Sequence, residues 1–123
     1  MPFTTTLRVE EVEGRDDSWR LIEPLVYHGH SDVFIVPADF VTDFGSVPRY
    51  LRWLVPAYGR GKKAYVLHDY LYRSGEVPRD DADGIMRRVM RELRSTKPVR
   101  WMAWLGVRVG GGAAWKKYRE WSK

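Results

Sequence analysis

The 123-residue chain contains no cysteine and only three histidines. The absence of cysteine excludes a disulfide framework, a thiolate zinc site and a cysteine nucleophile, so a bound metal would need histidine or carboxylate ligands. No apolar run approaches the roughly 18 residues of a membrane span. Residues 1–8 lack the basic start and apolar stretch of a secretory signal. We therefore expect a protein that neither spans a membrane nor is exported by the standard route.

What the chain does contain is enough apolar material for one core. Hydrophobic residues make up 44% of it, including six tryptophans, seven tyrosines and four phenylalanines. Aromatic side chains of this number fill a small interior, and the length is typical of one domain. We expect a single domain over residues 1–123, strand-rich over 1–40 and helical over 46–121.

The charge is unevenly distributed along the chain. Residues 1–50 hold four basic and nine acidic side chains, whereas residues 51–123 hold 17 basic and seven acidic ones. From Ile85 onward there are 11 basic and two acidic residues. A field of this kind favours a phosphate backbone, an anionic membrane surface or an acidic protein as partner. The structural alternative is a helix with a basic solvent face.

The N-terminal third shows strand patterns. Strands are predicted over 4–12, 19–27 and 32–36, with turns at 13–17 and 28–32. Pro24 predicts a sheet edge or a bulge, because proline cannot donate to a ladder. These segments predict a small antiparallel meander.

The remainder has helical periodicity. Helices are expected over 46–55 with Ser46 as cap, over 62–73 ended by Gly75, from Arg79 with Asp80 or Asp81 as cap, and from Pro98. Three glycines at 110–112 should break the last helix before 115–121. The predicted fold class is α+β, a small N-terminal antiparallel sheet followed by a bundle of three to four helices.

Three polar stretches, at 36–49, 64–72 and 79–83, contain the most chemically interesting residues. They include Thr-Asp-Phe-Gly-Ser-Val-Pro-Arg at 42–49 and His-Asp-Tyr-Leu-Tyr at 68–72. In this order they resemble the domain-of-unknown-function family numbered 1353, small proteins of tailed phages and prophages, over roughly residues 34–90. The chain departs from the family at Asp39, where glycine is common, and at Gly45, where alanine is common. The resemblance implies a phage setting, in the virion or in the host cytoplasm during assembly.

The polar stretches suggest either a structural network or a site. His68 and Tyr72 share a helix face, whereas Asp69 is rotated by about 100°. We predict that Asp43, His68 and Asp83 converge. The network candidates are Thr42, Asp43, Ser46, Arg49, His68, Asp69, Arg79 and Asp83. The catalytic candidates are His68, Asp69, Asp43, Ser46 and Tyr72. Asp43, His68 and Asp83 are the candidate ligands of a divalent metal, and no other cofactor is expected.

The C-terminal region suggests an interface, because tryptophan and arginine are favoured at binding hot spots. Its candidate residues are Trp101, Trp104, Arg108, Trp115, Tyr118 and Trp121.

Two classes of function follow, and whether the chain is an enzyme stays open between them. The first is a phage or prophage structural or assembly protein, tail-associated, that docks on other phage structural proteins through the aromatic and basic C-terminal region. The alternative is a small metal-dependent hydrolase acting on cell wall or nucleic acid through His68 and the aspartates. A nucleic-acid-binding accessory role comes third. The sequence carries no Gly-rich phosphate loop, nucleophile elbow or zinc-protease motif.

Overall fold

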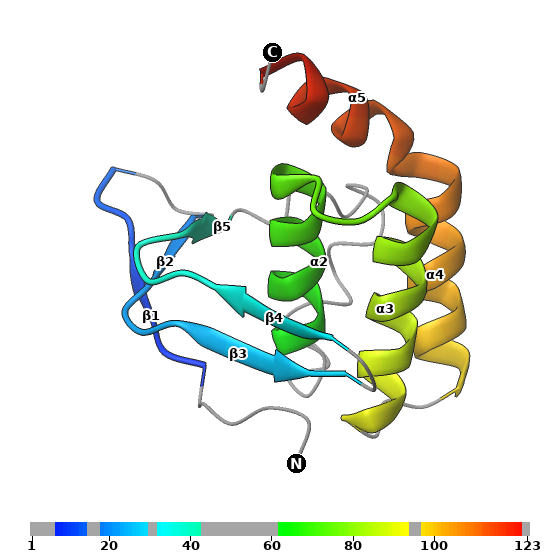
Figure 1. Cartoon of the computed structure of the whole chain (residues 1–123), viewed down its shortest axis with the longest axis horizontal. Coiled ribbons are helices and arrows are strands. Elements are labelled where there is room, and N and C mark those ends of the chain that lie inside the picture. The colour runs from blue at the N-terminus through cyan, green and yellow to red at the C-terminus, as the bar shows by residue number, and fades with distance from the viewer. Residues whose placement is uncertain (1–6, 15–17, 30–31, 43–61, 94–96, 122–123) are drawn as a thin grey trace. The chain divides into compact units, whose positions relative to one another are not determined.

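The computed structural model describes residues 7–14, 18–29, 32–42, 62–93 and 97–121. The chain divides into two compact units, residues 1–43 and 44–123. The first holds the strands and the second the helices (Figure 1), so the predicted α+β class is confirmed. Among the described residues, no helix is long and apolar enough to cross a membrane. The predicted helix over 46–55 lies outside the described residues.

The first unit contains a three-stranded antiparallel sheet in the order β1-β2-β5. Its strands are β1 (Val9–Glu11), β2 (Trp19–Leu21) and β5 (Val41–Thr42). Val9 pairs with Leu21, and Trp19 pairs with Thr42 on the other side. β5 was not predicted, because a two-residue strand leaves no alternation pattern to detect.

A separate hairpin joins β3 (Leu25–His28) to β4 (Val33–Val36), with Leu25 opposite Val36 and Tyr27 opposite Phe34. These four side chains are buried, whereas Val33 and Ile35 on the opposite face are exposed. Alternation in both strands is what a sheet with one covered face requires.

The predicted single strand over 19–27, and with it a single meander, is wrong. The strand divides between Leu21 and Leu25, where Pro24 has no N–H to donate. After the break, Ile22 donates its N–H to the Arg8 carbonyl, whereas Asp39 donates to the Leu21 carbonyl. Asp39 has a φ of 70°, a left-handed conformation that favours glycine and that aspartate tolerates. The chain therefore forms two sheets where one was predicted.

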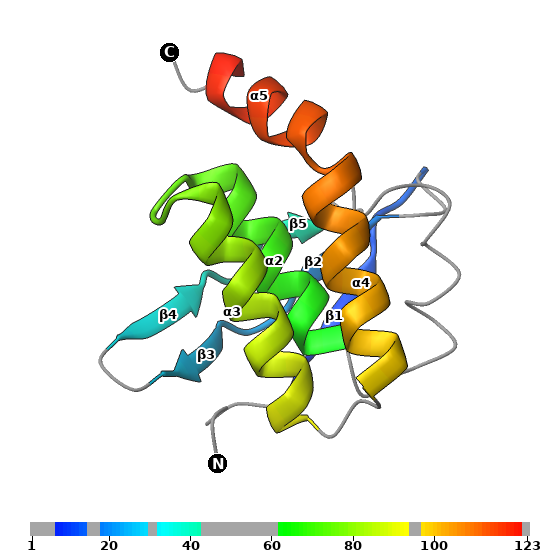
Figure 2. The ribbon, with the colours of Figure 1, turned by 90° about the vertical axis from the view of Figure 1, so that its right-hand side faces the viewer.

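The second unit is helical from residue 62 onward. It contains α2 (Lys62–Ser74), α3 (Arg79–Glu92), α4 (Lys97–Gly110) and α5 (Gly112–Trp121). In Figure 2, α3 lies beside α4, and α3 also packs on α2. α3 buries Ala82, Ile85, Met86, Val89 and Met90 on one face, as its 3.6-residue periodicity predicts.

The start of α3 and the break between α4 and α5 can be compared with the sequence predictions. The N-cap residue of α3 is Pro78, which makes no side-chain capping hydrogen bond, so the predicted capping by Asp80 or Asp81 is wrong. Both aspartates lie in the first turn, where their charge still opposes the helix dipole. The predicted break at the glycines is confirmed, since α4 ends at Gly110 and α5 starts at Gly112.

Gly111 lies in that break because a side chain would not fit there. A Cβ at this position would lie 2.5 Å from the Val107 carbonyl oxygen and 2.8 Å from the Tyr72 hydroxyl. The junction between α4 and α5 therefore sits directly over the C-terminal part of α2.

Candidate functional site

The carboxylate of Asp83 is the centre of a buried cluster in the helical unit. Its Oδ1 lies 2.7 Å from His68 Nε2 and accepts a 2.7 Å hydrogen bond from the Tyr72 hydroxyl. Its Oδ2 accepts a 2.8 Å hydrogen bond from Arg108 Nη1. His68, Tyr72 and Asp83 have no exposed surface. Three helices thus meet at one buried charge.

The local sequence places these side chains together. His68 and Tyr72 are four residues apart on α2, so their rings project from the same face, with centroids 4.2 Å apart. Arg79 and Asp83 have the same spacing on α3, and Arg79 Nε lies 3.9 Å from Asp83 Oδ2. α2 and α3 therefore present complementary groups to each other.

Arg79 connects this cluster to the end of α4. Its Nε donates to the Tyr72 hydroxyl at 3.1 Å, and its Nη2 donates to the carbonyl oxygens of Val107 and Arg108, each at 2.8 Å. The last carbonyls of a helix have no partner within the helix, so a guanidinium placed there satisfies them and complements the helix dipole. Arg79 thereby fixes the C-terminus of α4 against α2 and α3.

The electrostatics favour an ionised Asp83. Burial by itself raises the pKa of the carboxyl, but the hydrogen bond and electrostatic attraction from His68, with the hydrogen bonds from Tyr72 and Arg108, hold the pKa below its ordinary value of 3.8. An ionised carboxylate can only accept, so His68 Nε2 carries the hydrogen of that contact. The hydrogen bond to Asp83 also raises the pKa of Arg108. Burial, followed by the bond to Asp83, raises the pKa of Tyr72, which stays protonated as a donor.

A second guanidinium holds α5 on α2. Arg119 Nη2 donates to the carbonyl oxygens of Tyr72 at 2.7 Å and Arg73 at 2.9 Å, at the end of α2. Its guanidinium also lies over the Trp115 ring, 4.5 Å from the centroid, and Trp115 meets Tyr72 edge-on at 5.3 Å. The C-terminal helix is thus attached through polar and aromatic contacts.

Several sequence-predicted residues do meet. The structure brings together His68, Asp83, Tyr72 and Arg79, so the predicted approach of His68 to Asp83 is confirmed. Asp69, also buried, forms an ion pair with Arg73 at 3.2 Å. Thr42 is buried in β5 of the first unit. Asp43, Ser46 and Arg49 lie outside the described residues.

Two members of the arrangement were missed by the sequence analysis. Arg108 was expected at an external interface, yet its guanidinium is committed to Asp83. Arg119 was not singled out at all. Neither position carries a local signal, because a partner 25 or 46 residues away is set only by how the helices pack.

The cluster is poorly suited to a metal. Within the described ranges, no group of three or more His, Asp or Glu side chains could hold an ion. Around Asp83 the neighbours are two arginines, a tyrosine and a histidine, and two guanidinium charges disfavour a cation there. What this arrangement does chemically is hold an ionised carboxylate among donors from three helices.

The remaining candidates differ in exposure. Trp101 is 48% exposed, whereas Tyr118 is buried and Trp115 packs on Tyr72. Trp104 is half-buried, with its ring 5.6 Å from that of Trp101. The side chain of Trp121 lies outside those described.

α4 also exposes three aliphatic side chains that were not proposed from sequence. Met102, Leu105 and Val109 are 44%, 58% and 73% exposed. Their spacing of three and four residues, with Trp101 one turn before Leu105, puts them on one face of the helix. We call Trp101, Met102, Leu105 and Val109 the α4 outer face.

Comparison with known proteins gives one match. The sequence model of a family described as "Protein of unknown function (DUF1353)" matches residues 19–107. The described part of that range runs from β2 to the last turn of α4, and includes every residue around Asp83 except Arg108. No curated protein and no solved structure matches the chain.

Proposed function

We propose that this chain, which belongs to the DUF1353 family of unknown function, is a non-catalytic structural or assembly protein of a phage or prophage particle, associated with the tail. It docks on another protein of the particle through the α4 outer face. The observation that carries this proposal is the contiguous exposure of Trp101, Met102, Leu105 and Val109 on one helix.

The burial of the polar cluster supports a non-catalytic role. His68, Asp69, Tyr72 and Asp83 have no exposed surface, and both carboxylate oxygens of Asp83 already accept hydrogen bonds. A general base or nucleophile must reach its substrate within hydrogen-bond distance. His68, Tyr72 and Asp83 instead bond to one another, and Asp69 pairs with Arg73. Buried polar groups that are satisfied in this way stabilise a fold.

The α4 outer face supports a protein partner. Contiguous exposed apolar patches mark interaction sites, and an apolar helix face fits a hydrophobic groove on another protein. Tryptophan is enriched at the centre of such interfaces. The part-buried hydrogen bonds of Arg108 to Asp83, and of Arg79 to the α4 carbonyls, hold this helix in place. The face is therefore presented with little loss of conformational freedom on binding.

The proposal is tested by complementation in the phage or prophage that encodes the chain. After deletion of its gene, wild-type protein supplied in trans should restore particle assembly, and Leu105→Asp should not, because a charge would enter an apolar interface. Ile22→Asp is the matched control, since Ile22 is 53% exposed and lies outside α4. Normal particle yield and infectivity with Leu105→Asp, or no need for the chain at all, would contradict the proposal.

A further inference from the structure

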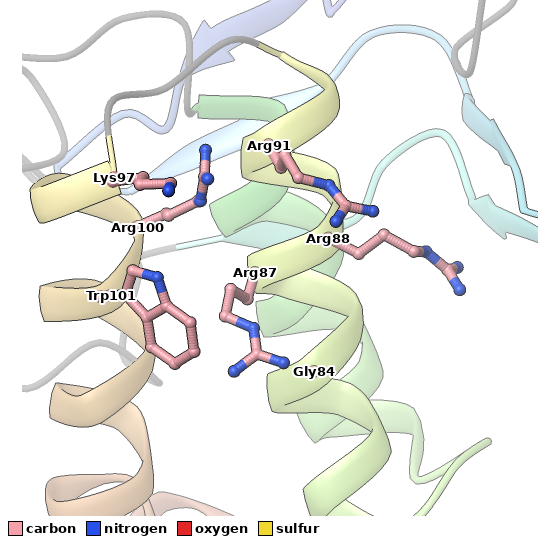
Figure 3. Close-up of a pocket in the computed structure, with 7 residues that line it drawn as sticks. All are labelled: Gly84, Arg87, Arg88, Arg91, Lys97, Arg100 and Trp101. Carbon is pink, nitrogen blue, oxygen red and sulfur yellow. The ribbon is translucent and has the colours of Figure 1, made fainter.

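A pocket of about 460 Å³ lies between α3 and α4. From α3 it is lined by Gly84, Arg87, Arg88 and Arg91. From α4 it is lined by Lys97, Arg100 and Trp101. Figure 3 shows Arg87 and Trp101 next to each other between the two helices. The lining residues that the structure describes thus comprise five cations, one tryptophan and one glycine, with no acid among them.

Arg87 is held in place by aromatic rings. Its guanidinium lies 4.5 Å from the centroid of Trp101 and 5.0 Å from that of Trp104. The N–H groups of a guanidinium point outward in its own plane, so a ring on its face leaves them available to an acceptor. Within the described part of the chain, no hydrogen bond or ion pair engages Arg87.

Among the described residues, part of the positive charge that lines the pocket has no anionic partner, namely that of Arg87, Arg91 and Lys97. Arg88 forms an ion pair with Glu92 at 3.8 Å, and Glu92 is the acidic residue in the last part of α3. Arg91 and Lys97 are exposed, and among the described residues neither has an anionic partner. A pocket lined by several cations attracts an anion through more than one of them at once.

The pocket has open space next to Gly84. A Cβ built on Gly84 would meet no atom within 4 Å, so packing does not demand a glycine there. Its lack of a side chain leaves room beside Arg87 and Arg88. A bulky group can therefore approach the α3 backbone between the cations.

We propose that this pocket binds single-stranded nucleic acid, with backbone phosphates on Arg87, Arg91 and Lys97 and an unpaired base against Trp101. Guanidinium groups match phosphate oxygens bidentately, and a base stacks on an exposed aromatic ring. An acidic peptide would use the cations but would bring no base to stack on Trp101 within the pocket. A duplex would present no unpaired base. This site goes beyond the docking role. Trp101 belongs to both surfaces, but the five cations of the pocket do not belong to the α4 outer face, and their binding of phosphate does not depend on whether Leu105 and Val109 meet a protein.

The test measures binding of a fluorescent oligothymidylate of about 12 nucleotides, a length within single-strand site sizes, to the full chain at several salt concentrations. Arg91→Glu/Lys97→Glu should weaken binding at least tenfold and flatten the salt dependence, because fewer counterions are released. Lys116→Glu/Lys117→Glu is the matched control, since it makes the same charge change at two exposed positions on α5. It should bind within about threefold of wild type.

Trp101→Ala separates stacking from charge. It should weaken binding about 5- to 150-fold, the range for loss of one base stack, and Trp101→Phe should restore most of that loss. The site is overturned if both charge-reversed double variants lose affinity equally. It is also overturned if a duplex or polyglutamate binds as tightly as the single strand and Trp101→Ala changes nothing.

Discussion

Asp83 of α3 and Arg108 of α4 form an ion pair at 2.8 Å, in which the carboxylate is fully buried and the guanidinium is about one-third exposed. Asp83 is also the charged acceptor of the buried donors His68 and Tyr72, and a buried donor left without its acceptor costs its desolvation penalty. These contacts predict that the fold depends on Asp83.

Asp83→Asn should lower the free energy of unfolding by about 1–3 kcal/mol, because the amide nitrogen that replaces one carboxylate oxygen cannot accept the hydrogen bonds that this oxygen accepts. Asp80→Asn is the control, because Asp80 also faces Arg108, at 4.0 Å, but its side chain is 86% exposed. It should change the stability by less than about 1 kcal/mol. Urea unfolding of the two variants checks this, and equal losses would mean that Asp83 does not hold the helices together.

Acid should remove the contribution of Asp83 to the free energy of unfolding. Its pKa is lower in the folded chain than the ordinary value of 3.8, so its stabilisation is complete above that value and is lost as the pH falls through the folded-state pKa. The difference in unfolding free energy between wild type and Asp83→Asn should therefore be constant from about pH 5 to 7 and shrink below the ordinary aspartate pKa. Urea unfolding over this pH series measures it. A difference that grows toward acid would contradict the ionised state of Asp83.

The Tyr72 hydroxyl should contribute more to the stability of the fold than the hydroxyl of Tyr70, two residues away. Tyr72 donates to Asp83 and accepts from Arg79, both in the cluster, whereas Tyr70 donates to Glu76 at the surface. Tyr72→Phe should cost about 1.5–3 kcal/mol, as for a hydrogen bond to a buried charge, and Tyr70→Phe less than about 0.5 kcal/mol. Thermal or urea unfolding distinguishes them, and similar values for both would argue against a stabilising network.

Gly84 within α3 and Gly111 between α4 and α5 should respond oppositely to alanine. Gly84→Ala should raise stability by about 0.5–1 kcal/mol, because α3 gains helix propensity and the added methyl meets nothing. Gly111→Ala should lower stability, because its Cβ would press on the Val107 carbonyl oxygen. Changes of the same sign in urea unfolding would show that the α4 to α5 junction is not tightly packed.

The sequence contained part of the site because local spacing fixes which side chains share a helix face. The i, i+4 relations of His68 with Tyr72, and of Arg79 with Asp83, follow from helical geometry alone. The approach of α2 to α3 was inferred from the similar polar content of the two segments. That inference was confirmed for His68 and Asp83.

What the sequence could not supply depends on tertiary packing. Arg119 satisfies carbonyls of α2 from a helix 46 positions later, and nothing near Arg119 encodes this. The break after β2 shows a related limit, because the alternation on either side of Pro24 looks like one strand. Helical spacing also could not tell whether Leu105 and Val109 face a core or solvent, since both arrangements use the same period.

Docking of the α4 outer face is tested most directly by photo-crosslinking in assembling particles. A photoreactive phenylalanine derivative replaces Leu105, or Ile22 as the control, and adducts are identified by mass spectrometry. The account predicts an adduct between position 105 and another protein of the particle, with none from position 22. The absence of any adduct from position 105 in particles that contain the chain would contradict it.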